Sequence, residues 1–248
     1  MKKKYTRKQF EDVRFEFAKK MSKDTKLQKE ALDVLVKADH YNWIHQTNWM
    51  GQPILQLPQD MFALQEIIYN TKPEFIIETG IAWGGSLLFY STLMEALGGK
   101  KVIGIDIFIP PDLKKRLNSY GRISKRIELI KGSSPEESTV NKLKSIIGNS
   151  KKVLVILDSN HTHDFVLREL NIYSQFVGKG HYLVCGDTIV EDIPEQKHRP
   201  RSWGHGNNPK TALKQFLREN KAFEIDKKLM NKLLLSCNPD GYLIRCKD

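Results

Sequence analysis

The spacing of apolar positions along this chain changes near Pro73. Over residues 7–38 they recur at intervals of about three to four residues, which is the spacing of one or two amphipathic helices. Pro58 then begins a further helix that ends before Pro73, because proline suits the first turn of a helix and cannot continue one. We therefore predict an amino-terminal helical cap over residues 1–72, which is an accessory segment of the main domain.

Beyond Pro73, short apolar runs alternate with helical stretches, and three of the runs stop at a carboxylate. These runs are Phe75 to Glu78, Lys101 to Asp106 and Val153 to Asp158. A run that is apolar throughout indicates a strand buried on both faces, and alternation of such strands with helices indicates a parallel sheet. Residues 73–248 are therefore predicted to form one α/β domain, a Rossmann-like, mostly parallel sheet with helices on both faces.

The same pattern places the remaining elements of the domain. Strands are predicted at 127–131 and 181–187, and helices at 85–97, at 112–121, up to residue 147, at 163–177 and at 209–218. Two last strands, 231–237 and 241–246, enclose an Asn-Pro-Asp-Gly turn and predict an antiparallel hairpin. Residues 191–208 are polar and rich in proline and glycine, which is typical of an active-site lid or of a surface loop.

Composition and charge exclude some classes of protein. With 40% hydrophobic and 28% charged residues the chain is globular, and no apolar run reaches the roughly 18 residues of a membrane helix. Its start lacks the hydrophobic segment of a signal peptide, so we expect a cytoplasmic protein. The net charge is +11, and the basic residues are interspersed with acidic ones along the chain. This pattern favours a solvated basic face and leaves anionic substrates, membrane surfaces and nucleic acid as alternatives.

The first of the three runs leads into a glycine-rich turn that opens a helix. Its glycines let the backbone pass close to a ligand, and the helix that follows presents a partly positive end. The spacing differs from the G-x-G-x-x-G of nicotinamide and flavin proteins, and such turns also occur for steric reasons alone. We interpret this region as a site for a nucleoside-bearing cofactor, formed by Glu78, Gly80, Ala82, Gly84 and Ser86.

Two further strand ends fit the same cofactor. Asp106 lies where α/β nucleotide binders place a carboxylate that accepts hydrogen bonds from ribose hydroxyls, although a solvated acid at a strand end is the simpler alternative. Ser133 and Ser134 follow the next strand, and we expect them along the adenine side of the cofactor.

Polar side chains also gather after two buried strands on either side of the expected substrate crevice. Asp158 ends one strand and Asp187 ends the other, and two carboxylates with waters suit a hard divalent cation such as Mg²⁺. His161 or His163 is a candidate general base, because imidazole titrates near neutral pH, but either can instead cap a helix. Zinc is not favoured, since no Cys/His set has zinc spacing.

Six segments of the chain stand out together. They are Gly51–Asp60, Ile77–Ser86, Leu157–His163, Asp187–Asp192, Trp203–Pro209 and Gly241–Leu243. As a set they resemble the cephalosporin hydroxylase / rhamnosyl O-methyltransferase family, and the resemblance runs from about residue 40 to the end. It implies a class I S-adenosylmethionine-dependent methyltransferase fold, with a seven-stranded sheet whose last strand is antiparallel, and a divalent metal at the carboxyl edge.

By analogy with catechol-type O-methyltransferases, the resemblance implies roles for individual residues. Asp158 and Asp187 would bind the metal, Asp158 would also contact the cofactor and the reacting groups, and His161 would be the catalytic base. Related enzymes have another carboxylate just before Asp187, where this chain has Gly186, so water, Thr188 or substrate oxygens would complete the metal sphere. Hydroxylase chemistry is discounted, because the histidines and the acid around one strand end make a poor iron triad.

The resemblance thus implies a metal-assisted O-methyltransferase that acts on a hydroxyl of a sugar, glycan or natural product, as in polysaccharide biosynthesis. Residues 191–208 would cover the site, and Arg199, Arg201 and Trp203 would contact a sugar or an anionic group. Three alternatives remain open: a cofactor-binding partner subunit without turnover, a cephalosporin-hydroxylase-like role in secondary metabolism, and an RNA methyltransferase. The amino-terminal helices are candidates for pairing subunits in a homo-oligomer.

Overall fold

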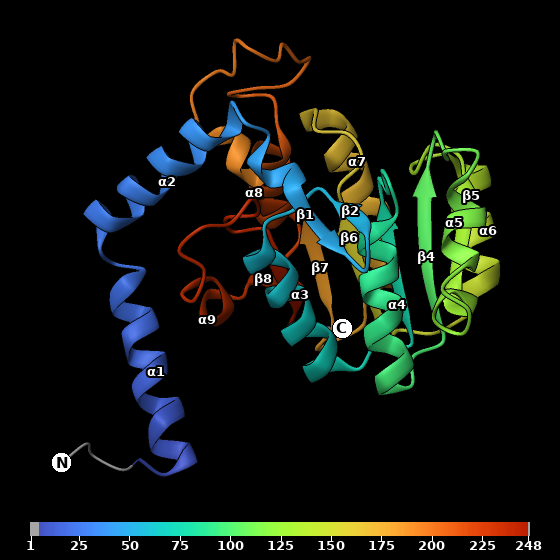
Figure 1. Ribbon diagram of the computed structural model, residues 1–248, viewed down its shortest axis with the longest axis horizontal. Helices are drawn as coiled ribbons and strands as arrows, with labels where there is room; N and C mark the ends of the chain where they lie inside the picture. Colours follow the sequence, from blue (N-terminus) through green and yellow to red (C-terminus); the bar gives the residue numbers. More distant parts are fainter. Residues whose placement is uncertain (1–4, 248) are drawn as a thin grey trace.

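A seven-stranded sheet forms the centre of the computed structural model, which describes residues 5–247 (Figure 1). In the order β5-β4-β3-β6-β7-β9-β8, the strands run parallel except β9, which is antiparallel to both of its neighbours. The bounds are β3 (Phe75–Thr79), β4 (Lys101–Asp106), β5 (Ile127–Lys131), β6 (Val153–Leu157), β7 (Tyr182–Cys185), β8 (Phe223–Ile225) and β9 (Tyr242–Arg245). The predicted α/β class, with its mostly parallel sheet and antiparallel last strand, is confirmed.

The register of the three central strands brings their carboxyl ends to one edge of the sheet. Glu78 of β3 pairs with Gly104 of β4 and with Ile156 of β6. All residues of β3 and β6 are buried, which explains why both strands are almost uninterrupted apolar runs. The acids at the ends of β3, β4 and β6 therefore come from neighbouring strands at the same edge.

Helices cover both faces of the sheet, and each face has its own hydrophobic core. One core includes α6 (Glu137–Ile147), α7 (His163–Tyr173) and α8 (Pro209–Glu219). The other includes α3 (Pro58–Thr71), α4 (Gly85–Leu97), α5 (Leu113–Asn118) and α9 (Lys227–Met230). The apolar side chains of these helices face the sheet and leave its carboxyl edge for polar groups.

The first helices lie beside the sheet domain. α1 (Arg7–Met21) buries none of its residues and extends away from the sheet in Figure 1. α2 (Thr25–Asp39) buries three of its residues, and a short hairpin of β1 (Thr47–Trp49) and β2 (Gln52–Ile54) follows it. The division into a cap and a methyltransferase domain at residue 72 stays a prediction, and α3 shares a hydrophobic core with the sheet.

The predicted hairpin at the carboxyl end is wrong in its first strand. The antiparallel partner of β9 is β8, while residues 231–237 form turns and bends. The hydroxyl of Ser236 and the backbone N–H of Cys237 donate to the buried carboxylate of Asp60 in α3, at 2.6 and 2.8 Å. This carboxylate thus satisfies a backbone N–H that a neighbouring strand would otherwise pair with, in a run that packs as an irregular segment.

Two predicted helices are shorter than expected. α5 ends at Asn118 and a 3₁₀ helix follows at Ile123–Arg126, while α7 ends at Tyr173 and continues as a 3₁₀ turn, Ser174–Phe176. The other predicted helices and strands of the sheet domain are present with small shifts at their ends. Among residues 5–247, no helix has both the length and the apolar character needed to cross a membrane.

Gly85 at the start of α4 allows β2 to pass close by, and replacing it is expected to destabilise the protein. In Gly85→Ala, the new Cβ atom would lie 2.1 Å from the carbonyl oxygen of Pro53, which is inside contact distance. Alanine is otherwise the better helix former, so the clash must outweigh a gain of about 1 kcal/mol. We expect a net loss of about 1–3 kcal/mol in the free energy of unfolding, measured by denaturant titration.

The matched control is Gly204→Ala, because a Cβ atom at residue 204 meets nothing within 4 Å. Its stability should stay within about 0.5 kcal/mol of the wild type. Equal or higher stability of Gly85→Ala would show that β2 does not pack on α4 as described.

Candidate functional site

The carboxyl ends of β3, β4, β6 and β7 border a cavity of about 390 Å³. Its lining at the sheet edge includes Gly80, Ala82, Asp106, Asp158, His161 and Asp187. Its opposite wall is formed by the end of α2, by His45 and by parts of the segment 189–201. The structure thus brings predicted cofactor residues and predicted metal residues to one cavity.

Gly80 determines how the glycine turn lies against β6. Its φ angle is +79°, and its N–H donates to the carbonyl of Ile105 at 2.9 Å. A Cβ atom at this position would lie 2.1 Å from the carbonyl oxygen of Asp158, so any larger residue would displace either the turn or the strand end. Glycine is therefore required where the predicted cofactor turn meets the predicted metal-binding strand.

Asp106 ties the end of β4 to the same turn. One of its carboxylate oxygens accepts the N–H of Ile81 at 2.9 Å, and the other accepts the N–H of Phe108 at 3.0 Å. Each oxygen keeps further acceptor capacity, and the residue lines the cavity. Its predicted role as the acceptor for ribose hydroxyls is compatible with this position and stays a prediction.

Glu78 is a buried carboxyl group next to the turn. Its Oε2 accepts the hydroxyl of Ser86 at 2.6 Å, and its Oε1 accepts the hydroxyl of Tyr90 at 3.0 Å. Burial raises the pKa of Glu78 to about 8, although the hydrogen bond from Ser86 acts in the opposite direction. Glu78, Gly80 and Ser86 line a second, smaller cavity, so a positively charged ligand group placed there would favour the ionised carboxylate.

Asp158, His161 and Asp187 form a cluster in which one ligand atom of each lies within 4.8 Å of the others. Nε2 of His161 lies 3.0 Å from Oδ2 of Asp187 and 3.4 Å from Oδ1 of Asp158. These contacts lack hydrogen-bond geometry, so neither buried ring nitrogen has a hydrogen-bond partner among the described residues. Two carboxylates that converge in this way fit a hard divalent cation, and the unpartnered imidazole lies directly beside them.

The protonation of His161 is set by the same two acids. Burial alone would lower the pKa of the ring, but the close contacts with Asp158 and Asp187 raise it to about 10. Without another cation, the protonated ring therefore offsets one of the two negative charges. The indole of Trp203 stacks on His161 with 4.9 Å between the ring centres and closes one side of the cluster.

Gly186 leaves space for the carboxylate of Asp158. A Cβ atom at residue 186 would lie 2.9 Å from Oδ1 of Asp158 and 2.9 Å from the carbonyl oxygen of Leu157. A carboxylate residue at this position, which the resemblance implied for related enzymes, would displace Asp158 in this arrangement. The glycine that this chain has at residue 186, in place of the carboxylate residue of related enzymes, therefore leaves room for the side chain of Asp158.

The structure separates the two candidate bases. His163 begins α7, and its ring nitrogens lie 2.8 Å from the hydroxyl of Thr211 and 3.1 Å from Oε1 of Gln215. These contacts join α7 to α8 and direct the ring toward that helix. Of these two histidines His161 is the one that lines the cavity, so it is the one placed to act as a base.

Two other predicted residues face away from the cavity. The prediction of Thr188 as a metal ligand is wrong. The residue is fully buried, and its hydroxyl donates to the carbonyl of Pro239 at 2.6 Å, because the chain turns into a 3₁₀ helix at this residue. The buried hydroxyl of Ser134 donates to Glu169. Ser133 is half-buried, and the expected adenine contact of both serines stays a prediction.

Gln56 lies against the site and was not predicted. Its Nε2 donates to Oδ2 of Asp158 at 3.3 Å, while its buried Oε1 has no hydrogen-bond partner among the described residues. Together with Glu78 and Ser86 it lines the smaller cavity. It belongs to the segment Gly51–Asp60 that carried the family resemblance, but no sequence signal placed that segment at the end of β6.

A family model described as Rhamnosyl O-methyltransferase/CmcI matches residues 41–246. The chain belongs to this family. It is 30% identical over 202 residues to a rhamnosyl O-methyltransferase of Mycobacterium leprae, over 80% of this chain and 83% of that protein. It is 25% identical over 219 residues to one of Mycobacterium bovis, over 85% of each chain. A solved structure described as CmcI with Mg and SAM has a TM-score of 0.55 at 20% identity, over 81% of this chain and 77% of that one.

Membership of the rhamnosyl O-methyltransferase/CmcI family confirms the prediction of an S-adenosylmethionine-dependent O-methyltransferase. The likeness to the CmcI structure shows that the two proteins share the class I methyltransferase fold. The matched region contains all the residues of the cluster and the glycine turn.

A residue outside the matched region holds the loop 191–208 in this family member. Asp39 at the end of α2 is buried, and its Oδ2 accepts Nε2 of Gln196 at 2.6 Å and contacts Nε2 of His198 at 2.8 Å. Its Oδ1 accepts a hydrogen bond from Arg199. The loop is thus tied to α2 on the far side of the cavity from the sheet.

Replacement of Asp39 is expected to release this loop. In Asp39→Ala the three side chains lose their common acceptor, and hydrogen bonds to a charged group contribute about 1.5–3 kcal/mol each. We expect tryptic cleavage at Lys197, Arg199 or Arg201 under native conditions to accelerate by about tenfold or more, as followed by mass spectrometry.

The control for this experiment is Asp33→Ala, which removes an exposed acid from the same helix. Its cleavage rate should match that of the wild type. If Asp39→Ala is cleaved no faster than Asp33→Ala, other contacts hold the loop.

Proposed function

We propose that this chain transfers a methyl group from S-adenosylmethionine to a hydroxyl of a sugar, glycan or other natural product, with the help of Mg²⁺ or another hard divalent cation. The observation that carries the proposal is the cluster of Asp158, His161 and Asp187, which lines the same cavity as the glycine turn. The sugar or glycan acceptor draws further support from the names of the mycobacterial relatives. The cytoplasmic location and the homo-oligomer stay predictions.

On this proposal the residues of the turn bind the cofactor. The backbone from Gly80 to Ser86 and the buried Glu78 receive its methionine part, and Gln56 offers its unpartnered Oε1 to the same part. Asp106 accepts the ribose hydroxyls. The side chains of Trp83, Ile107 and Phe108 are exposed close to these residues in the sequence, and they provide an apolar surface for the adenine.

The cluster activates the acceptor. Asp158 and Asp187 would hold the cation, which when bound lowers the pKa of a coordinated hydroxyl. Neutralising these two carboxylates also removes the cause of the raised pKa of His161, so the ring becomes able to take up the hydroxyl proton. Trp203, stacked on His161, keeps water from that side of the ring.

His161→Gln and His163→Gln test the assignment of the base. Loss of the base at residue 161 is expected to lower the rate of methyl transfer by about 10²–10⁴. His163→Gln should keep the rate within a few-fold, because that ring contacts Thr211 and Gln215 outside the cavity. The measurement is formation of S-adenosylhomocysteine with a panel of rhamnosides and other glycosides.

Binding of S-adenosylmethionine, measured by calorimetry with and without Mg²⁺, provides the second readout for the same variants. Both should bind the cofactor as the wild type does, since neither histidine is part of the glycine turn. Undiminished transfer by His161→Gln, or absence of cofactor binding by the wild type, would refute the proposed mechanism.

The affinity for S-adenosylmethionine is expected to rise with pH because of Glu78. Burial raises the pKa of this carboxyl to about 8 in the free protein, so it is mostly protonated at pH 7. A cationic ligand favours the ionised form, and binding therefore releases a proton. We expect affinity to increase by up to about tenfold per unit below pH 8 and to level off above it.

Glu78→Gln serves as the control, because it keeps the shape of the side chain and cannot ionise. Its affinity should be lower and should not change over the same pH range. A pH dependence that is the same in Glu78→Gln and wild type would assign the titration to another group.

A further inference from the structure

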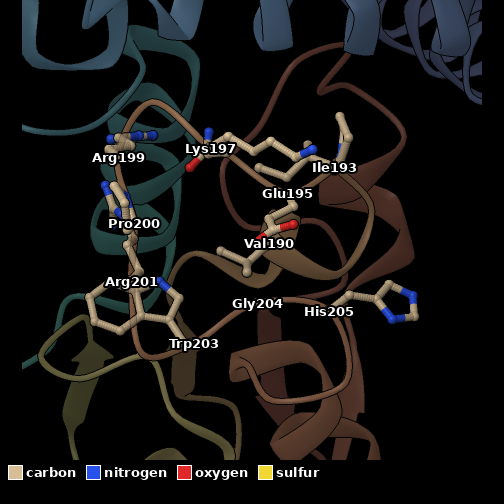
Figure 2. Close-up of a pocket in the computed structure, with 12 residues that line it drawn as sticks. Val190, Ile193, Glu195, Lys197, Arg199, Pro200, Arg201, Trp203, Gly204 and His205 are labelled. Carbon is tan, nitrogen blue, oxygen red and sulfur yellow. The ribbon is translucent and has the colours of Figure 1, made fainter.

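The wall of the 390 Å³ cavity that faces the cluster is basic. Arg199, Arg201 and His45 line it. Figure 2, a close-up of the neighbouring pocket that the loop forms, shows the two arginines and Trp203 along one stretch of that loop. The guanidinium of Arg201 lies over the indole of Trp203 at 5.1 Å, and Trp203 stacks on His161. One aromatic ring thus connects Arg201 to the histidine of the cluster.

The two arginines differ in how their charges are balanced. Arg199 pairs with Asp39, although its buried Nε has no hydrogen-bond partner among the described residues. Arg201 is exposed at the cavity, and within residues 5–247 it forms neither a salt bridge nor a hydrogen bond. Its contact with Trp203 leaves the edge of the guanidinium available for a ligand.

The electrostatic surroundings of this wall are positive. Partial burial of its side chain and the neighbouring charge of Arg199 lower the pKa of Arg201, while the charges of Asp187 and Asp39 act in the opposite direction. Burial, Arg199 and Arg201 together lower the pKa of His45, which favours its uncharged form. On the opposite side a divalent cation would balance Asp158 and Asp187. On this wall Arg199 is paired with Asp39, so Arg201 carries the positive charge that no salt bridge within residues 5–247 balances.

We propose that the methyl acceptor is a sugar that carries an anionic group, a carboxylate or a phosphate, bound by Arg201 with help from Arg199. A guanidinium binds both groups through paired N–H donors, which an uncharged sugar cannot match. The anionic group would then lie at the loop, while a hydroxyl of the same sugar reaches Asp158, Asp187 and His161. This inference rests on the proposed function and names the class of acceptor for that site.

The test compares three probes that share one sugar ring: methyl glucoside, methyl glucuronide and glucose 1-phosphate. Binding is measured by calorimetry on the full chain with S-adenosylhomocysteine and Mg²⁺ present. We expect at least one anionic probe to bind about tenfold more tightly than methyl glucoside. The glucuronide arm identifies an acidic sugar, and the phosphate arm identifies a sugar phosphate.

Variants assign the preference to Arg201. Arg201→Gln should reduce the preference for the anionic probe to about twofold or less. Arg201→Lys should keep part of the preference, because lysine retains the positive charge but lacks the paired N–H donors of the guanidinium. Lys197→Gln removes the same charge from the same loop, but residue 197 does not line this cavity, so it should keep the full preference. Circular dichroism checks that each variant is folded.

Several outcomes would overturn the inference. They are equal binding of the three probes, no binding of either anionic probe, and a preference that survives in Arg201→Gln. Weakened binding of S-adenosylhomocysteine in Arg201→Gln would also overturn it, since that result would assign the arginine to the cofactor. Absence of S-adenosylhomocysteine binding in the wild type would instead contradict the proposed function, so the two failures are distinguishable.

Discussion

The contact between Gly80 and the end of β6 is the constraint on which the rest of the site depends. It places the turn after β3 directly on the carbonyl of Asp158, and the N–H of Asp158 donates in turn to the carbonyl of Thr79 at 2.9 Å. The close approach and the hydrogen bond fix the two strand ends relative to each other. Methyl transfer requires the acceptor oxygen, the methyl carbon and the sulfur that leaves to lie in one line, so its rate depends on such positioning.

A second set of buried contacts fixes the other half of the cluster. Asp60 in α3 accepts hydrogen bonds from Ser236, at 2.6 Å, and from Tyr242 of β9, at 2.8 Å. Asn238, in the turn between them, accepts the backbone N–H of Asp187 at 2.9 Å. The left-handed backbone at Asp187 is therefore held from the side opposite to β6, and its carboxylate is directed toward the cavity by α3 and β9 together.

Much of this site could be predicted from the sequence, because the strands that build it are central and buried. Uninterrupted apolar runs locate β3, β4 and β6, and the first polar residue after each run must lie at the carboxyl edge. Asp106, Asp158 and Asp187 follow from that rule alone. The short edge strand β8 escaped it, because its three residues carry too little periodicity to distinguish a strand from a loop.

Contacts between segments distant in sequence could not be predicted. Gln56 precedes Asp158 by 102 positions, and only the fold brings its amide to that carboxylate. Thr188 shows the reverse error, since it is adjacent to Asp187 in sequence but its side chain is turned to the opposite side. Nor does any local pattern show that the buried acid of α3 accepts the backbone N–H of Cys237 where a hairpin partner was predicted.

Asp39 lies ahead of the stretch that the family model matches, whereas the cluster and the glycine turn lie inside it. The side chains that Asp39 contacts, Gln196, His198 and Arg199, belong to the loop and not to the strand ends. A substitution in α2 would therefore alter the outer wall of the cavity before it altered the edge of the sheet.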